Sequence, residues 1–293
     1  MLAAACWGVG TVVSKRAVTE IPALTLLPIQ LAVSVGVLSV AARRRGERPP
    51  AGGDGRRLGL LGLLNPGLAY ALSLLGLMQV SASLSVLLWA GEPILILVLA
   101  RLILRERVGA AIAGLSAVAL GGLVLVVYDP AASGALAGIV LTAAGVACCA
   151  VYTVLSRRWL PSVESTLGVV LAQQAWALAF AIMLLVGVAA AGVGVVPSGL
   201  TPTGAIAAVA SGLIYYGLAY VFYLSGLRRA PASVAAASFY LIPVFGVGAA
   251  TLIGERLGGL QWFGALIVIA AVAAILVRQA GRSTRIEAAA PGA

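Results

Sequence analysis

Apolar segments of roughly membrane-spanning length follow one another along almost the whole chain. They are separated by short breaks that contain Arg, Pro, Asp or clustered Gly, residues that commonly end a helix. A transmembrane helix needs about 20 apolar residues, because each residue adds only about 1.5 Å across the hydrocarbon core. The pattern predicts ten transmembrane helices, over residues 2–18, 22–42, 58–78, 82–104, 108–128, 134–156, 164–192, 203–226, 231–254 and 258–278.

The composition supports a membrane protein. Hydrophobic residues make up 62% of the 293 residues and charged residues only 10%, whereas soluble domains are about half apolar and about a quarter charged. The chain has no His, and its three Cys residues have the spacing of neither a disulfide framework nor a zinc site. We therefore expect no metal and no cofactor. The first apolar stretch is interpreted as a helix rather than a signal peptide, and its shortness leaves room for a natural start further upstream.

Basic residues gather on one side of the predicted bundle. If the N-terminus is cytoplasmic, 16 of the 19 Lys and Arg residues lie on the inner side, and only Lys15, Arg16 and Arg256 lie on the outer side. The positive-inside rule then places both termini in the cytoplasm, in agreement with an even number of spans. The formal charge of +10 thus indicates topology-setting loops and not a nucleic-acid partner.

The second half of the chain repeats the first. The tetrapeptide GLAY occurs at 67–70 and at 217–220, and Pro93 recurs at the same offset of 150 as Pro243. Helix 1 recurs at an offset of 142 through Cys6, Thr11 and Ser14, which match Cys148, Thr153 and Ser156. Five helices are an odd number, so the second copy must be inverted in the membrane. We predict repeats over 1–130 and 131–278, followed by a disordered cytoplasmic tail over 279–293.

Inverted repeats are typical of transporters, which place the substrate site near the bilayer midplane. Helix 4 carries Ser81, Ser85, Trp89 and Glu92 at spacings of 4, 4 and 3, which puts them on one face. A carboxylate at this depth usually faces the bundle interior or a water-filled cavity. Pro93 is expected to kink helix 4, and its copy Pro243 to kink helix 9, as a pair of gates.

Aromatic residues form a second candidate face. Tyr216, Tyr220 and Tyr223 share one face of helix 8, and helix 3 offers Asn65 and Tyr70. The repeat makes Tyr70 equivalent to Tyr220, and Trp89 equivalent to Phe239. If these faces converge around Glu92, the pocket suits a ligand with an amine and an apolar body.

Structural alternatives stay open for these residues. Tyr215, Tyr216 or Trp159 could be membrane-interface residues, and Glu92 could be a protonated structural group. Lys15 could snorkel, anchor an anionic group or take part in coupling. Other polar residues have structural interpretations. Glu106 and Glu255 could cap helices at the ends of spans. Gln173 and Gln174 could form interhelical hydrogen bonds or line the pocket.

Three segments resemble a known family. CWGVGTVVSK (6–15) resembles the start of an EamA domain, residues 81–126 resemble its end, and residues 233–276 repeat that end. The chain is similar to two-domain EamA members of the drug/metabolite transporter superfamily, and within it to bacterial aromatic amino acid exporters. The resemblance implies a central cavity lined by helices 1, 3, 4, 6, 8 and 9. Two positions depart from the pattern. Gln30 occupies a site where many relatives carry Arg, and Ile242 is the counterpart of Glu92.

The residues and the resemblance together predict a secondary transporter of the bacterial inner membrane that exports amino acids by alternating access. Its expected partners are the bilayer and a small-molecule substrate, with a monomer as the working assembly. The candidate substrate-binding residues are Trp7, Thr11, Tyr70, Ser85, Trp89, Glu92, Tyr216, Tyr220 and Phe239. A carrier for drugs or nucleotide sugars is the alternative. A membrane-embedded enzyme or a channel fits less well, since no catalytic constellation, charged filter ring or P-loop is evident.

Overall fold

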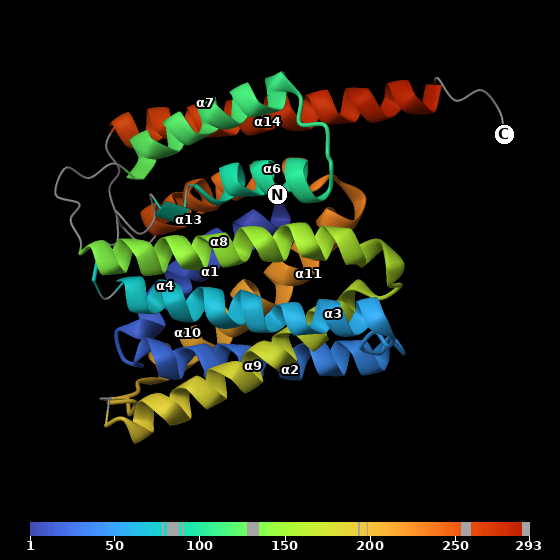
Figure 1. The fold of residues 1–293 in the computed structure, drawn as a ribbon. Helices are drawn as coiled ribbons and strands as arrows, with labels where there is room; N and C mark the ends of the chain where they lie inside the picture. The colour runs from blue at the N-terminus through green and yellow to red at the C-terminus, as the bar shows by residue number, and fades with distance from the viewer. Residues whose placement is uncertain are drawn as a thin grey trace.

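The computed structural model describes the chain except for residues 78, 81–87, 90, 128–134, 193, 198, 253–258 and 289–293. The described residues form a bundle of helices that lie side by side, with connections at both ends (Figure 1). The predicted all-α, ten-span membrane fold is confirmed for this part of the chain. The spans are α1 (Leu2–Val18), α2 (Ala23–Arg44), α3–η1–α4 (Gly53–Gly62, Leu63–Leu68, Ala69–Leu77), α6 (Glu92–Ile103), α7 (Ala110–Val127), α8 (Leu136–Trp159), α9 (Thr166–Ala190), α10–η3–α11 (Pro202–Ser211, Gly212–Leu218, Ala219–Arg229), α12–η4–α13 (Ala232–Ala237, Ser238–Tyr240, Leu241–Leu252) and α14 (Gly259–Ala288).

The outer surface of the bundle is apolar. Leu102, Met183 and Val277 are each more than 60% exposed. Exposed apolar surface on this scale marks a membrane-facing protein, because the hydrocarbon core has no water to exclude. Five described helical segments are long and apolar enough to cross a bilayer on their own: Ala23–Arg44, Leu136–Ser162, Thr166–Ala190, Pro202–Arg229 and Gly259–Arg278.

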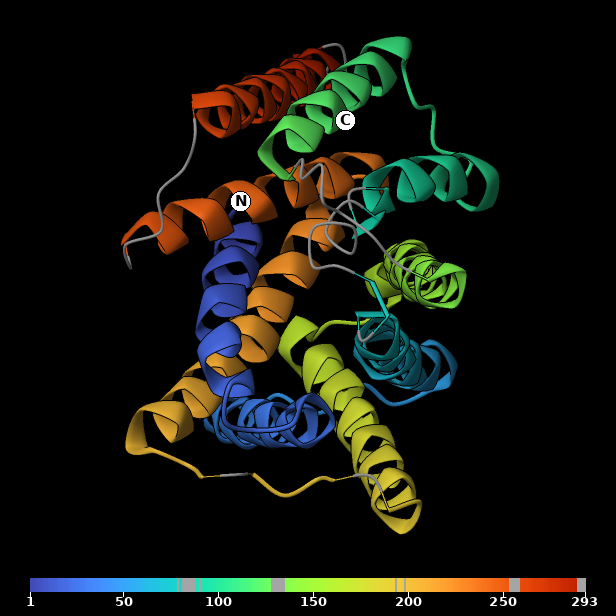
Figure 2. The same cartoon turned by 90° about the vertical axis from the view of Figure 1, so that its left-hand side faces the viewer.

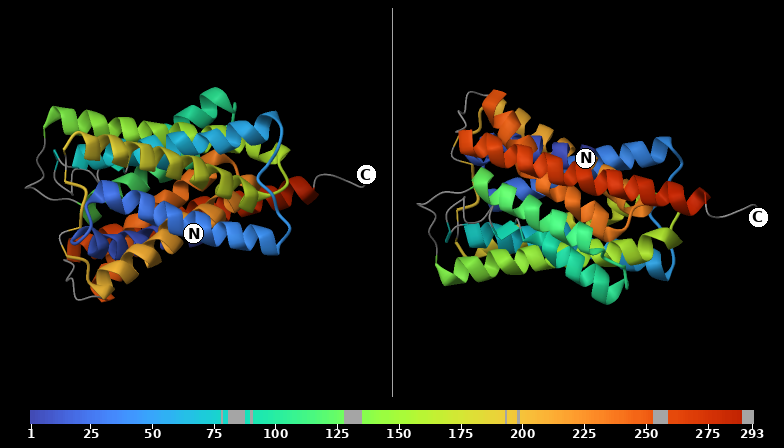
Figure 3. Two further views of the ribbon diagram at one scale, coloured as in Figure 1. Left: turned by 90° about the horizontal axis from the view of Figure 1, so that it is seen from below. Right: turned by 90° about the horizontal axis from the view of Figure 1, so that it is seen from above.

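The two halves are interlocked in a reciprocal way. The first helix of the first half, α1, packs against α10, α11 and α13, which belong to the third and fourth spans of the second half. Its counterpart α8 packs against α3, α4 and α6, the third and fourth spans of the first half. The second spans α2 and α9 pack together, and the last spans α7 and α14 pair at the periphery (Figures 2 and 3). Helices that correspond to each other under the internal repeat thus pack against partners that also correspond to each other.

The repeat extends to irregularities of the backbone. The third span of each half contains a π-helical turn, η1 over Leu63–Leu68 and η3 over Gly212–Leu218. In η1 the helix is interrupted at Asn65, whose φ of −148° and ψ of 122° are non-helical, directly before Pro66. Single π turns inside α-helices are frequent at functional sites. Each turn ends on the first two residues of a repeated GLAY segment.

The expected proline kinks take a different form. α6 begins at Glu92 after a turn at Gly91, so Pro93 lies in the first turn of a new helix. In the second half a 3-10 turn over Ser238–Tyr240 precedes α13, and Pro243 lies in its first turn. Proline is tolerated there because the first N–H groups of a helix have no intrahelical acceptor. An irregular helical turn therefore precedes the proline in each span, while the backbone stays right-handed helical at Gly91, Ser238 and Leu241.

The last helix is longer than expected. α14 continues through residues 279–288, where we expected a disordered tail. This segment contains Gln, Ala, Arg and Glu, which favour helix even without apolar contacts.

Glycines allow two close helix contacts. A Cβ atom added at Gly8 would lie 2.6 Å from the Gly246 nitrogen and 2.6 Å from the Ile242 oxygen, so α1 touches α13 through backbone. Gly122 and Gly264 form the same kind of contact between α7 and α14, since a Cβ at Gly264 would lie 2.6 Å from the Gly122 oxygen. Small residues at such crossings are typical of membrane helix packing.

Candidate substrate-binding site

Aromatic side chains from several helices meet in the interior of the bundle. They come from α1, α4, α8, η3, α11 and η4, together with Trp89, and each ring centroid lies 5.0–6.5 Å from at least one other. Pairs at such distances each contribute about 0.5–1.5 kcal/mol beyond their buried area. We call this group the aromatic cluster: Trp7, Tyr70, Trp89, Tyr152, Tyr215, Tyr216, Tyr220, Tyr223 and Phe239.

Trp7 joins one side of the cluster. Its ring makes edge contacts with Tyr220, Tyr223 and Phe239 at centroid distances of 5.5, 5.3 and 5.5 Å. These contacts connect α1 to α11 and η4, so they cross between the two repeats. The Trp7 Nε1 atom is buried and has no hydrogen-bond partner among the described residues. Buried indole N–H groups usually have a partner, so this donor is available to an acceptor on a ligand.

Tyr70 joins the other side. Its ring stacks on Trp89 at 6.2 Å, and its hydroxyl donates a hydrogen bond of 3.0 Å to the Tyr215 hydroxyl. Tyr220, the repeat partner of Tyr70, donates from its hydroxyl to Asn65 Oδ1 at 3.2 Å. The two equivalent tyrosines therefore each bond to the third span of the opposite half. The convergence expected for Tyr70, Trp89, Tyr220 and their neighbours is present.

Glu92 lies beside the cluster. It is the first residue of α6, is 8% exposed, and is close enough to Cys149, Tyr215 and Tyr223 to interact with them electrostatically. No hydrogen bond or ion pair involves its carboxyl group within the described part of the chain. A buried carboxylate without a partner is costly, and the N-terminal end of α6 offsets only part of that cost. A ligand cation or a proton would supply the rest.

The remaining candidates are placed less centrally. Thr11 is exposed one turn after Trp7, and its hydroxyl donates to the Trp7 carbonyl oxygen at 2.8 Å. Lys15 is exposed one further turn along the same face. Ser85 lies outside the described residues. The alternative in which Tyr215 and Tyr216 are membrane-interface residues does not fit their interior positions, whereas Trp159 lies at a helix end beneath the Arg57 guanidinium.

Two members of the cluster were missed by sequence reasoning. Tyr215 is the repeat partner of Asn65, which was itself a candidate, so the repeat could have identified it. Tyr152 has no such signal. It is 1% exposed, and its hydroxyl donates to Gln173 Oε1 at 2.8 Å. That bond, together with the 3.0 Å bond from Gln173 Nε2 to the Leu58 oxygen, favours the interhelical interpretation of Gln173.

Gln30, at the position where the family resemblance led us to expect an arginine, makes hydrogen bonds between helices. Its Nε2 donates to Ser14 Oγ at 3.0 Å and to Ser211 Oγ at 2.7 Å. The side chain is 4% exposed and thereby ties α2 to α1 and α10. A neutral amide can satisfy two buried hydroxyl groups without introducing a charge.

One end of the bundle is held closed by polar bonds between helices. We call it the Arg157 end, and the opposite one the Lys15 end. The Glu106 carboxylate accepts hydrogen bonds from the N–H groups of Ala232 and Ser233 at 2.9 and 3.2 Å, and so caps α12 as expected. Arg157, at the end of α8, donates to the carbonyl oxygens of Leu227 and Arg228 at 2.9 and 2.8 Å. These bonds tie the connection after α6 to α12, and α8 to α11.

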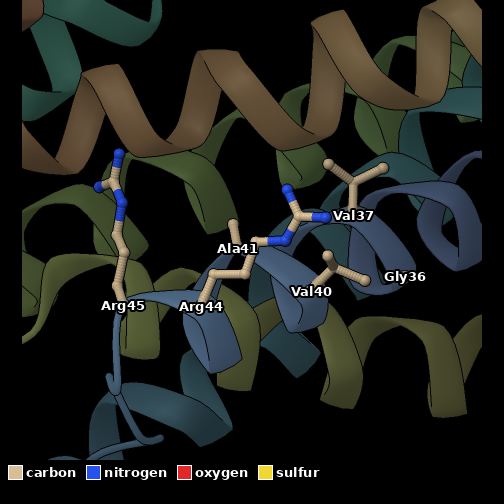
Figure 4. A pocket seen from close by; sticks show the side chains of 6 residues that line it. All are labelled: Gly36, Val37, Val40, Ala41, Arg44 and Arg45. Atoms are coloured by element: carbon tan, nitrogen blue, oxygen red, sulfur yellow. The ribbon is translucent and has the colours of Figure 1, made fainter.

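Two pockets in the described part of the chain lie away from the aromatic cluster. One follows α2 from Gly36 to Arg45 (Figure 4), and the other lies between the start of α3 and Trp176 on α9. At the expected centre of the bundle, the rings of the described residues are in mutual contact.

Comparison with known proteins agrees with this architecture. The model of the EamA-like transporter family matches the chain twice, over residues 1–128 and 136–277. The protein belongs to this family of membrane transporters, within the drug/metabolite superfamily. A solved structure titled "Crystal structure of protein" has the same fold, with a TM-score of 0.79 over 95% of this chain and 96% of that chain at 19% identity. A search among curated proteins gave no match.

Proposed function

We propose that this transporter exports small amphipathic metabolites from the cytoplasm across the bacterial inner membrane, with amino acids, and aromatic ones in particular, as substrates. The observation that carries the proposal is the chemistry beside the aromatic cluster. One buried donor, Trp7 Nε1, lacks a partner among the described residues, and one buried carboxyl group, Glu92, lacks a counter-charge there. An amino acid offers a carboxylate to the first, an ammonium to the second and a side chain to the rings.

Alternating access explains the broken helices. Two discontinuous spans at matching positions are a common transporter device, because the half-helices can move separately around a central site. The irregular turns before Pro93 and Pro243 provide such hinges. Rings of the described residues touch one another in this conformation, so a substrate that enters between them has to separate them.

The direction of closure follows from the charges. The positive-inside rule assigns the Arg157 end to the cytoplasm, and the bonds of Glu106 and Arg157 hold that end together. This conformation is accordingly closed to the cytoplasm. Export would require these bonds to break once per cycle, so that the substrate can enter from inside.

The test is amino acid flux into liposomes that contain the purified protein. Radiolabelled Phe, Tyr, Trp, Thr and Leu are compared with and without a pH gradient. We expect saturable transport that favours the aromatic substrates. Acceleration by the gradient would make Glu92 a proton carrier, and insensitivity would make it a contact for the substrate ammonium. Absence of flux for all five amino acids would refute the substrate assignment.

Two variants test the site. Glu92→Gln is expected to lower flux at least about tenfold, since a neutral amide neither pairs with an ammonium nor carries the proton. Trp7→Phe keeps a ring but removes the N–H group, so KM should rise about tenfold, as expected for one buried hydrogen bond. Trp176→Phe on the exposed face of α9 is the matched control. Unaltered flux in a folded Glu92→Gln protein would contradict the role of the carboxyl group.

A further inference from the structure

We infer that a groove on the outward face of α2 binds one anionic phospholipid molecule. The groove encloses about 480 Å³ and is lined by Gly36, Val37, Val40, Ala41, Arg44 and Arg45 (Figure 4). The inference rests on the membrane location of the protein and on the proposed cytoplasmic side of the arginine loops, and it is independent of the substrate.

The groove has an apolar part that is open to lipid. Its residues recur at helical spacing, so they share one face of α2, while Leu31, Ser34 and Leu38 face the bundle interior and are buried. Val37 and Val40 are 44% and 51% exposed. A Cβ atom added at Gly36 would meet nothing within 4 Å, so the missing side chain leaves space where an acyl chain can lie.

At the C-terminal end of α2 the groove is lined by two cationic side chains. Arg44 and Arg45 are exposed, and neither has a hydrogen bond or an ion pair among the residues that the structure describes. The Arg45 side chain extends towards a neighbouring helix, whereas the Arg44 side chain runs along α2 towards Val37 (Figure 4). The nearest acidic residues along the chain are engaged elsewhere, since Glu47 bonds to Ser165 and Asp54 pairs with Arg57. No described acidic residue forms an ion pair with Arg44 or Arg45, so their charges are open to a ligand.

The shape and the charge together fit one ligand chemistry. From Gly36 to Arg44 the helix rises by about 12 Å, which accommodates the upper part of an acyl chain below a headgroup. Guanidinium groups bind phosphate oxygens through paired hydrogen bonds, and basic grooves at the cytoplasmic surface favour anionic lipids. A phospholipid with a net negative headgroup places its phosphate between the arginines and its tail over Val37 and Val40.

Native mass spectrometry of the full chain tests this site. The protein in detergent is titrated with phosphatidylglycerol, with phosphatidylcholine and with inorganic phosphate. We expect one retained phosphatidylglycerol per protein, at least about tenfold weaker retention of phosphatidylcholine, and no displacement by phosphate. Displacement by inorganic phosphate would show a simple anion site and overturn the lipid assignment. A second copy of the chain that occupies the face, seen as dimers without bound lipid, would overturn it as well.

Variants separate a defined site from general attraction to basic surface. Arg44→Gln together with Arg45→Gln should weaken phosphatidylglycerol retention at least about tenfold, while Arg43→Gln together with Arg48→Gln removes the same charge at the same end and should change it less than about twofold. Gly36→Leu fills the apolar part and should abolish retention with both groove arginines intact. Equal losses in the two arginine pairs, or unchanged binding in Gly36→Leu, would refute the groove. Melting and size-exclusion profiles confirm that each variant is folded.

Discussion

Two faces that are equivalent under the internal repeat have different surroundings. On α8, Cys149 and Thr153 are 4% and 1% exposed, and the Thr153 hydroxyl shares a 2.8 Å hydrogen bond with the Tyr223 hydroxyl. One turn further, Arg157 bonds to the last carbonyl oxygens of α11. This face is covered along its whole length to the end of the bundle.

The matching face of α1 is covered only at its start. Trp7, the repeat partner of Cys149, is 6% exposed, but Thr11 and Lys15 are exposed, and the Thr11 hydroxyl bonds within its own helix. The same sequence pattern thus occurs on two helices of opposite orientation. Its copy on α8 is covered, and its copy on α1 is more exposed. Alternating access predicts that the two copies exchange these surroundings during transport.

The largest expected effect is a difference in chemical accessibility between the two faces. In a background with Cys6, Cys148 and Cys149 replaced by Ala, Thr11→Cys should react with a maleimide at least ~100-fold faster than Thr153→Cys. The buried position reacts only when the Arg157 end opens locally. The measurement is the labelling rate in proteoliposomes.

Two further substitutions refine this comparison. Arg157→Gln removes the bonds to α11 and should raise the labelling rate of Thr153→Cys several-fold. Lys15→Gln, at the equivalent position of α1, should leave that rate unchanged. Equal labelling of the two cysteines in the otherwise unaltered background would show that the faces do not differ in solution.

The second effect concerns how closely each first helix approaches its partner. Gly8 is equivalent to Ala150, so the repeat holds a glycine on α1 and an alanine on α8. Gly8→Ala would press a methyl group against Gly246 and Ile242 of α13 and should destabilise the protein by about 1–3 kcal/mol. Ala150→Gly creates no clash and should cost about 1 kcal/mol. Thermal unfolding in detergent compares them, and a milder effect at Gly8 would contradict the close packing.

The third effect concerns the cap on α12. Glu106→Ala leaves the N–H groups of Ala232 and Ser233 without their acceptor and should cost about 1–2 kcal/mol, as for loss of an N-cap. Glu106→Gln keeps one acceptor oxygen and should cost less. If the cap also holds the Arg157 end closed, Glu106→Ala should raise the labelling of Thr153→Cys. Unchanged labelling would limit Glu106 to a stabilising role.

Much of the fold could be predicted because apolar length and the repeat are direct physical signals. The helix breaks were harder, since Glu92-Pro93 fits both a kink within a helix and the first turn of a new one. The meeting of Tyr70, Trp89 and Tyr220 followed from the repeat, which relates faces across the two halves. Tyr152 was missed because it shares no polar pattern with its neighbours, and its position depends on how α8 packs against α9.

The smallest expected effect on stability comes from the hydrogen bonds between Glu20 and Thr201 at the Lys15 end. This effect depends on pH. The half-buried Glu20 carboxylate accepts hydrogen bonds of 2.9 Å from the N–H and from the hydroxyl of Thr201, and these bonds, with a smaller contribution from Arg16, lower the pKa of Glu20 below its ordinary value of 4.5. Because the folded state holds the ionised form, this contribution to stability is complete above about pH 5 and is lost as the pH falls through the lowered pKa. The difference in melting temperature between the natural protein and Glu20→Gln should therefore be small near neutral pH and vanish in acid. Glu106→Gln, measured in parallel, separates this end from the Arg157 end, and a difference at Glu20 that grows on acidification would contradict the bond to Thr201.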